Sequence, residues 1–223
     1  MDLFALVPVK DPASGKSRLA SLLSRDERAA LNTLLAHRAL EACTALFGVH
    51  RTLVVAGSTA AADIVRQHGV QVMTEEHGER NVNAAIAAGA EYIRRTGVGG
   101  IVVVPTDLPL LTKDALRDAV AALPAPPGCL LVPDHRGTGT NVVALTPVRC
   151  DLFSFGEPSL ERHVGLARRV GYDVRIHRSD ALEFDLDRPE DYDLLRKTTA
   201  WPIFESITPI RSQYPCVLTR PSA

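Results

Sequence analysis

The chain has 223 residues, carries 25 lysines and arginines against 26 aspartates and glutamates, and is 46% apolar. This is the composition of a globular protein, and the length fits one α/β domain with a full core. Because the formal net charge is only -1, the chain has no basic excess to bind a nucleic-acid backbone. We therefore expect no nucleic-acid partner.

The four cysteines are scattered, without a C-x-x-C pair or a histidine at zinc-finger spacing, and we expect them to be reduced. The apolar run at the N-terminus is too short for a secretory signal. No later segment approaches the roughly 20 apolar residues of a membrane span. We therefore expect a cytoplasmic protein that does not bind membranes.

Short apolar runs alternate with longer segments of helical period, which is typical of a mostly parallel sheet covered by helices. The runs predict strands over residues 3–9, 51–56, 70–73, 101–104, 129–132, 141–145 and 172–177. The first helical segment begins after Ser24. The others cover residues 60–67, 81–95, 112–123, 158–170 and 189–196.

Two local signals in this pattern are specific. Ser24 and Glu27 have the S-x-x-E spacing of a capping box, in which both side chains satisfy free N–H groups at a helix start. The run from Ile101 to Val104 is β-branched with no polar alternation, which indicates burial on both faces. We expect this run to be a central strand.

No repeat or linker divides residues 1–197, which we expect to form a single domain. The tail, residues 198–223, contains four prolines and shows no clear period. Its apolar side chains are too numerous for a purely solvated tail, so we expect it to dock on the body or on a second subunit of a homodimer. The apolar residues in question are Trp201, Ile203, Phe204, Ile207, Ile210, Tyr214 and Val217.

Ligands of open α/β sheets bind beyond the carboxyl ends of the strands, so polar residues that follow a strand are candidates for a site. The segment after the first strand contains Lys10, Lys16, Ser17 and Arg18, which offer cations and hydroxyls to a polyphosphate. Gly15-Lys16-Ser17 is not part of a P-loop, because the first glycine of that motif would fall at position 10. The alternative is a solvated basic loop.

Two acidic segments follow later strands. Asp107 comes after the central strand, where a carboxylate needs a cation or hydrogen-bond donors, and magnesium would serve. Asp185 and Asp187 are two residues apart, so both face one side of an extended segment and need a neutralising charge. The alternatives are a turn capped by Asp107, a helix capped by Asp187, and an Asp185–arginine pair.

A further set of residues could bind a second, anionic ligand. Thr140 precedes a strand, while Gly156 and Ser159 precede a helix whose N-terminal amides favour anions. Ser159 could instead be a simple capping residue. His135 and His163 lie near these segments, but an isolated histidine is more often structural, and we assign neither a role.

In this order, the segments resemble the guanylyltransferases of coenzyme F-420 biosynthesis, a family that joins GMP to a phosphorylated three-carbon acid. The resemblance spans nearly residues 1–197 and excludes the tail. It is carried by VPVKDPASGKSRLA, NAAIAAG, VVVPTDLPLL, GTGTNVVAL, FGEPSLERH and FDLDRPEDYDLL.

The resemblance implies a Rossmann-like nucleotidyltransferase domain of the glycosyltransferase-A type, with a mixed, mostly parallel sheet. It implies that GTP contacts residues of the first segment and of the helix near position 83, namely Pro8, Val9, Lys10, Lys16, Ser17, Arg18 and Asn83. Lys10, Lys16 and Asp107 are then catalytic. Magnesium is held by Asp107, Asp185 and Asp187, and the phosphorylated acid by Thr140, Gly156 and Ser159.

The reaction implied is attack of the acceptor's phosphate oxygen on the α-phosphorus of GTP, with release of diphosphate and transfer of the product to the next enzyme of the pathway. Phosphoenolpyruvate or 3-phospho-D-glycerate is the favoured acceptor, and 2-phospho-L-lactate is the third candidate. Two alternatives remain open. One is another nucleotidyltransferase of this fold, acting on molybdopterin or a sugar phosphate, although its G-G-x-G-x-R loop is absent. The other is a nucleotide-binding protein without catalysis.

Overall fold

The computed structural model describes residues 2–74, 81–205 and 207. Within these residues, seven strands form one sheet in the order β3-β2-β1-β4-β6-β5-β7. The strands are β1 (Leu3–Val9), β2 (Thr52–Ala56), β3 (Gln71–Thr74), β4 (Gly100–Val103), β5 (Gly128–Pro133), β6 (Thr140–Thr146) and β7 (Asp173–Ile176). The predicted strands are thus present, with ends that differ by a residue or two.

The sheet is mixed and mostly parallel. Strand β1 is parallel to β2 and to β4, β2 is parallel to β3, and β5 is parallel to β7. Strand β6 is antiparallel to both of its neighbours, β4 and β5. The predicted central strand is confirmed as β4, which is fully buried in the middle of the order. Because β6 runs backwards, its first residue lies at the edge where the other strands end.

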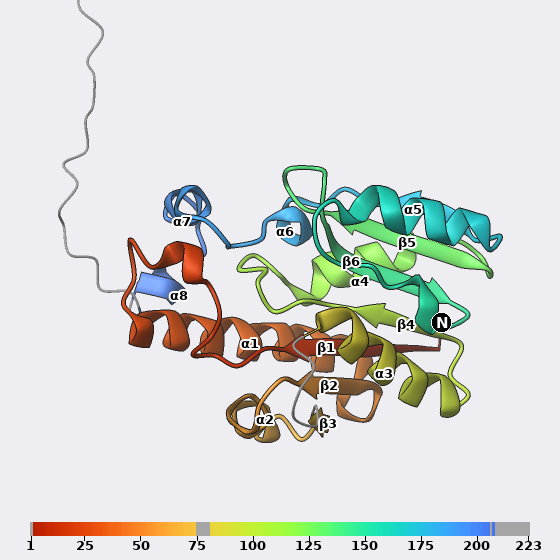
Figure 1. Cartoon of the computed structure of the whole chain (residues 1–223), viewed down its shortest axis with the longest axis horizontal. Helices are drawn as coiled ribbons and strands as arrows, with labels where there is room; N and C mark the ends of the chain where they lie inside the picture. Colours follow the sequence, from red (N-terminus) through yellow and green to blue (C-terminus); the bar gives the residue numbers. More distant parts are fainter. Residues whose placement is uncertain (1, 75–80, 206, 208–223) are drawn as a thin grey trace, which may run out of the picture.

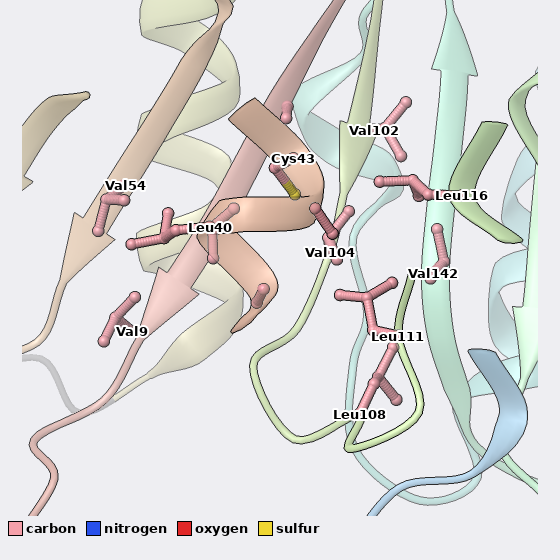
Figure 2. Packing of buried hydrophobic residues seen from close by; sticks show 14 of the residues in the cluster. Val9, Leu40, Cys43, Val54, Val102, Val104, Leu108, Leu111, Leu116 and Val142 are labelled. Carbon is pink, nitrogen blue, oxygen red and sulfur yellow. The ribbon is translucent and has the colours of Figure 1, made fainter. Parts of the chain in front are cut away.

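Helices cover both faces of this sheet (Figure 1). The helices longer than one or two turns are α1 (Arg25–Phe47), α2 (Thr59–Arg66), α3 (Val82–Arg95), α4 (Lys113–Ala121), α5 (Ser159–Arg169) and α7 (Pro189–Leu195). Helices α1, α2 and α4 pack on one face, where Leu40, Val54 and Val102 belong to a common core (Figure 2). Helices α3 and α5 pack on the other face, where Leu6 and Ile86 belong to a second core.

Helix α3 approaches the sheet closely at Gly89. A Cβ atom at this position would lie 2.7 Å from a methyl group of Leu6 and 2.8 Å from one of Val55. The glycine therefore lets the middle of α3 pack directly against β1 and β2.

Helix α1 begins as the sequence predicts. The Ser24 hydroxyl accepts a hydrogen bond from the Glu27 amide at 3.2 Å, and the Ser24 amide donates to the Glu27 carboxylate at 2.7 Å. This capping box satisfies two N–H groups that the helix leaves free, and it is confirmed.

A third apolar cluster, here called the end core, lies beyond the carboxyl edge of the sheet. It consists of Leu19, Leu23, Leu31, Leu35, Phe184, Leu186, Tyr192, Leu195 and Phe204. These residues come from the end of the segment after β1, the first half of α1, the acidic segment that contains Asp185 and Asp187, and the C-terminal helices (Figure 1). Burial of these side chains therefore holds segments together that are far apart in the sequence.

Two short helices were not predicted. Helix α6 (Asp180–Glu183) is a single turn, and α8 (Trp201–Glu205) lies inside the segment predicted as tail. Phe204 of α8 is fully buried in the end core, and the Trp201 ring packs edge-on against Tyr192, with centroids 5.5 Å apart. The predicted docking of Ile210, Tyr214 and Val217 lies outside the described residues, and the homodimer stays a prediction.

None of the described helices has the length and apolar character needed to cross a membrane. Cys43, Cys129 and Cys150 are free thiols, as the scattered spacing predicts, whereas Cys216 lies outside the described residues.

Candidate functional site

Two adjoining cavities lie at the carboxyl edge of the sheet and share part of the segment after β1. The first cavity has a volume of about 340 Å³ and lies between this segment, the segment after β4 and the start of β6. The second cavity has a volume of about 520 Å³ and extends over the ends of β1 and β2 towards α3. Pro8, Val9 and Lys10 line both.

Lys16 is the most constrained cation of the first cavity. Its backbone is left-handed, with φ of 56°, and its ammonium group donates a hydrogen bond to the backbone carbonyl of Leu186. Burial lowers the pKa of Lys16, while the carboxylates of Asp107, Asp187 and Asp185 act to raise it. The structure thus brings three predicted acidic residues within electrostatic range of one predicted lysine.

The next two residues of this segment are exposed and do not line either cavity. Ser17 begins a short 3-10 helix, Ser17–Leu19, which Leu19 anchors in the end core. The Arg18 guanidinium forms an ion pair with Asp187, and both side chains are partly exposed. An ion pair in this position neutralises Asp187 at low cost to either group, so a ligand with phosphates can displace it.

The three predicted magnesium ligands occupy different positions. Asp107 and Asp187 line the first cavity, whereas Asp185 does not. The Asp185 carboxylate contacts the His135 ring at 3.0 Å and the Arg136 guanidinium at 3.8 Å. Burial raises the pKa of Asp185 and the nearby Asp107 charge adds to this, while the His135 hydrogen bond opposes it.

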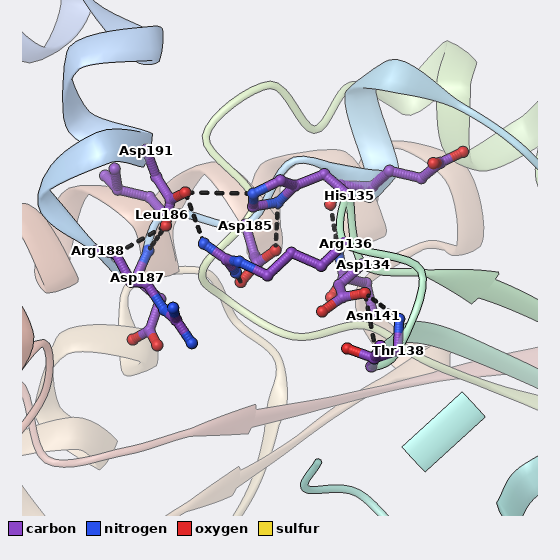
Figure 3. A network of polar contacts seen from close by, with 12 residues as sticks. Asp134, His135, Arg136, Thr138, Asn141, Asp185, Leu186, Asp187, Arg188 and Asp191 are labelled. Carbon is purple, nitrogen blue, oxygen red and sulfur yellow. Dashed lines mark hydrogen bonds and ion pairs between the residues drawn. The ribbon is translucent and has the colours of Figure 1, made fainter. Parts of the chain in front are cut away.

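Asp191 fixes the backbone of the acidic segment through hydrogen bonds to its amides (Figure 3). This fully buried carboxylate accepts hydrogen bonds from the backbone amides of Asp187, at 3.0 Å, and Arg188, at 2.7 Å. Its other oxygen contacts His135 at 3.2 Å and Arg136 at 2.9 Å. The N-cap residue of α7 is Arg188, and the Asp191 side chain accepts a hydrogen bond from its amide. Asp187 is therefore not the cap, and it lines the first cavity.

The fit of a metal ion rests on two of these carboxylates. No group of three or more histidine, cysteine, aspartate or glutamate side chains in residues 2–74, 81–205 and 207 is placed to hold a metal ion. The Asp107 carboxylate has no hydrogen bond or ion pair to any described residue, and Asp187 has only the exposed Arg18 pair. Magnesium commonly binds one or two carboxylates together with substrate phosphates, so these two side chains fit it.

Two of the three residues predicted to bind a second ligand line the first cavity, whereas Ser159 does not. Thr140, at the start of β6, and Gly156 both line this cavity. Gly156 has φ of 107°, a conformation that other residues rarely adopt. Ser159 is buried at the first position of α5 and makes no capping hydrogen bond, which contradicts the alternative that it is a simple cap.

Asn83 holds the segment that contains Gly156. Its side-chain carbonyl accepts a hydrogen bond from the Phe155 amide at 2.6 Å, and its side-chain NH2 donates to the Phe155 carbonyl at 3.1 Å. The neighbouring α3 residues Val82 and Ala85, not Asn83, line the second cavity. Asn83 therefore bridges α3 to the wall of the first cavity.

The two histidines that received no role from the sequence both contact this site. His135 joins Asp185 to Asp191, and His163 contacts Thr140 at 3.0 Å. Sequence reasoning missed them because their partners lie 50 and 23 residues away in the chain. The sequence offered one weak signal, namely that both histidines lie near the segments predicted to bind a second ligand.

Solved structures with this fold include several nucleotidyltransferases. A candidate nucleotide-diphospho-sugar transferase from Desulfovibrio desulfuricans G20 is 13% identical, with a TM-score of 0.71 and coverage of 92% of this chain and 94% of that one. A 4-diphosphocytidyl-2C-methyl-D-erythritol synthase is 18% identical, with a TM-score of 0.54 and coverage of 87% and 96%. These similarities confirm the predicted fold class.

The sequence comparisons are more specific. Phosphoenolpyruvate guanylyltransferase from Rubrobacter xylanophilus is 33% identical over 191 residues, which cover 86% of this chain and 92% of the relative. The enzyme of the same name from Roseiflexus castenholzii is 35% identical over 191 residues, 86% of each chain. The family described as guanylyl transferase CofC like matches residues 3–196. The chain therefore belongs to the CofC-like guanylyl transferase family.

Proposed function

We propose that the protein transfers GMP from GTP to a phosphorylated three-carbon acid and releases diphosphate, as a step of coenzyme F-420 biosynthesis. One observation carries this proposal: a cavity of about 340 Å³ is lined both by Lys10, Lys16, Asp107 and Asp187, here called the charged wall, and by Thr140 and Gly156, here called the acceptor wall. Of these two sets of residues, only the first has charged side chains. Such a cavity suits a nucleotide phosphate chain that meets a smaller anion.

The nucleotide occupies the second cavity and the charged wall of the first. Val55, Val82 and Ala85 give the second cavity apolar walls against which a flat base can pack. Pro8 and Val9 continue this surface into the first cavity, and Lys10 lines both. The triphosphate then extends towards Lys16, with Ser17 and Arg18 at its outer end. Asn83 supports the site from α3 through Phe155.

The chemistry is a displacement at the α-phosphorus of GTP. An oxygen of the acceptor's phosphate forms a bond to this phosphorus, the bond to the oxygen bridging to the β-phosphate breaks, and diphosphate leaves. A phosphate dianion is already nucleophilic, so no general base is needed. The difficulty is the repulsion between two polyanions, which Lys10 and Lys16 reduce by their charge and position.

Asp107 and Asp187 would hold magnesium together with the phosphates of GTP. When bound, the metal neutralises charge that develops on the leaving diphosphate. Asp185 adds a nearby negative charge, and its two carboxylate oxygens already contact His135 and Arg136. Arg18 moves from Asp187 to the phosphates when the nucleotide binds.

The acceptor is a small acid with a phosphate and a carboxylate, held by Thr140, Gly156 and Ser159. We propose phosphoenolpyruvate as the first candidate, because the curated relatives are named for it. 3-Phospho-D-glycerate and 2-phospho-L-lactate differ from it by few atoms and are the competing acceptors. Both substrates are water-soluble anions, so we place the reaction in the cytoplasm, where the product passes to the next enzyme of the pathway.

The test is to incubate the purified protein with GTP, magnesium and each of the three acids or, separately, a molybdopterin or a sugar phosphate, and to identify the products by mass. The proposal expects diphosphate together with the GMP adduct of one acid. Reaction only with a molybdopterin or sugar phosphate would favour another nucleotidyltransferase of this fold. GTP binding without any release of diphosphate would favour a non-catalytic protein and contradict the proposal.

A further inference from the structure

His163 lies between the two elements that form the acceptor wall of the first cavity. It belongs to α5, and only 2% of its surface is exposed. One side of the ring contacts Ser154, which starts the segment containing Gly156, and the other side contacts Thr140 at the start of β6. The ring also packs edge-on against Phe155, with centroids 5.0 Å apart.

The contacts of His163 fix which ring nitrogen carries the proton. The Ser154 backbone amide lies 2.9 Å from Nε2, and an amide N–H can only donate, so Nε2 must accept and is unprotonated. In a neutral ring the proton is then on Nδ1, which lies 3.0 Å from the Thr140 Oγ1. Burial lowers the pKa of His163 to about 4, which keeps the ring neutral at physiological pH.

This arrangement determines what the Thr140 hydroxyl can do. Its oxygen accepts a hydrogen bond from Nδ1–H of His163, so its own hydrogen must point elsewhere. The hydroxyl makes no other hydrogen bond to residues that the structure describes, and Thr140 lines the first cavity. Its hydrogen is therefore available to a ligand in that cavity.

We propose that His163 is a positioning residue, which sets the Thr140 hydroxyl as a hydrogen-bond donor to an unprotonated oxygen of the acceptor. The ligand class is a carboxylate or phosphate oxygen rather than a hydroxyl that must itself donate. This inference rests on the proposed function, because it assigns the ligand of Thr140 to the guanylyl acceptor. The sequence analysis expects Thr140 to contact the acceptor; this inference adds that Thr140 is the hydrogen-bond donor in that contact.

The protonation state can be measured without activity. Long-range 1H–15N spectra of the protein labelled at its histidines, with His163→Gln used to assign the signal, should show His163 protonated at Nδ1 only. This result is expected both with and without the acceptor. A ring protonated at Nε2, or at both nitrogens at neutral pH, would overturn the proposal even if guanylyl transfer is confirmed.

Two substitutions separate the two contacts of the ring. In His163→Asn the side-chain NH2 can take the place of Nδ1–H towards Thr140, whereas in His163→Gln the side-chain oxygen can take the place of Nε2 towards Ser154. We expect His163→Gln to raise the acceptor KM about tenfold, as for one lost hydrogen bond, and His163→Asn to raise it less. The KM for GTP should change in neither. An effect of His163→Asn equal to or larger than that of His163→Gln would overturn the proposal.

A double-mutant cycle then tests whether His163 acts through Thr140. Thr140→Val removes the hydroxyl, and in that background His163→Gln should cause no further rise in acceptor KM. Rises that multiply in the double variant would show that the two residues act independently and would contradict the proposal. If the wild-type protein transfers GMP to no phosphorylated acid, the proposed function itself fails, while the spectra still report on the ring.

Discussion

The two walls of the first cavity are built on different principles. On the wall of Lys16, Asp107 and Asp187, charged groups are partly exposed and compensate one another through contacts such as the Arg18–Asp187 pair. On the wall of Thr140 and His163, the side chains are neutral, buried and fixed by hydrogen bonds. The first wall can exchange its partners, whereas the second is set before any ligand arrives.

The difference reflects what each wall has to bind. A nucleotide with its metal brings large charges, and exposed ion pairs of low net stability can be replaced by them without a large penalty. A small acid offers few contacts, so its binding depends on donors that are already oriented. If the two walls are separable, a substitution on one wall should leave binding at the other unchanged.

Asp107→Asn should produce the largest loss. The change removes a charge from the wall without altering its shape, so the protein should fold normally while kcat falls about 10³-fold. Diphosphate release with saturating GTP and acceptor measures this loss. Asp114→Asn is the matched control, because Asp114 is exposed on α4 and, among the residues that the structure describes, pairs with Arg117 alone. Wild-type turnover in Asp107→Asn would show that the charged wall does not carry the reaction.

Acidification should destabilise the wall that contains His163. The pKa of this histidine is depressed from 6.5 to about 4 in the folded protein, mainly by burial. The unfolded chain therefore binds a proton that the folded chain does not, and stability is lost as the pH falls from about 6.5 towards 4. The loss amounts to about 3 kcal/mol. Urea unfolding at several pH values should show this dependence in the wild type and less of it in His163→Asn.

Substitution of the exposed His50 by glutamine controls for the loss of any histidine, because His50 lines neither cavity. The slope of stability against pH should be unchanged in this variant. If the slope of stability against pH fell equally in His163→Asn and His50→Gln, the pH dependence would not come from the buried, neutral His163.

Lys16→Ala tests the charged wall from its cationic side. The lost ammonium group can no longer offset the charge of the phosphates, so kcat/KM for GTP should fall about 100-fold, while the KM for the acceptor changes little. Steady-state kinetics with each substrate varied separately distinguishes the two. Lys113→Ala, at an exposed position that begins α4, is the control. A loss confined to the acceptor would contradict the assignment of the walls.

Ser159→Ala should have the smallest effect. We expect the acceptor KM to rise about tenfold, as for one lost hydrogen bond to an anion, with no change in the KM for GTP. The exposed Ser21 provides a matched serine-to-alanine control. If the effect appears in the KM for GTP instead, the separation of the two walls is wrong.

Much of the fold could be predicted because its signals are local. The β-branched run at Ile101, the capping box at Ser24 and the apolar period of the strands each depend on neighbouring residues, and each is present in the structure. Helix α8 could not be predicted in this way. Its five residues have no period of their own, and the helix is held by burial of Phe204 in the end core.

The site was predictable in its composition but not in its contacts. Position after a strand indicated Lys16 and Asp107, and position before a strand indicated Thr140; all three line the first cavity. An arginine partner for Asp185 was one of the alternatives, and Arg136 contacts it at 3.8 Å. The second partner, His135, could not be inferred, because it lies 50 residues away and reaches Asp185 only through the fold. The same holds for His163, whose role depends on the direction of a backbone amide.

The most direct test of the central claim is 31P NMR of the wild-type protein with GTP, magnesium and phosphoenolpyruvate in one sample. The account predicts that the three GTP resonances are replaced by free diphosphate and by two mutually coupled signals of an unsymmetrical diphosphate, and that Asp107→Asn abolishes both changes. Release of diphosphate without the coupled pair, which is simple hydrolysis, or an equal reaction with CTP, would contradict it.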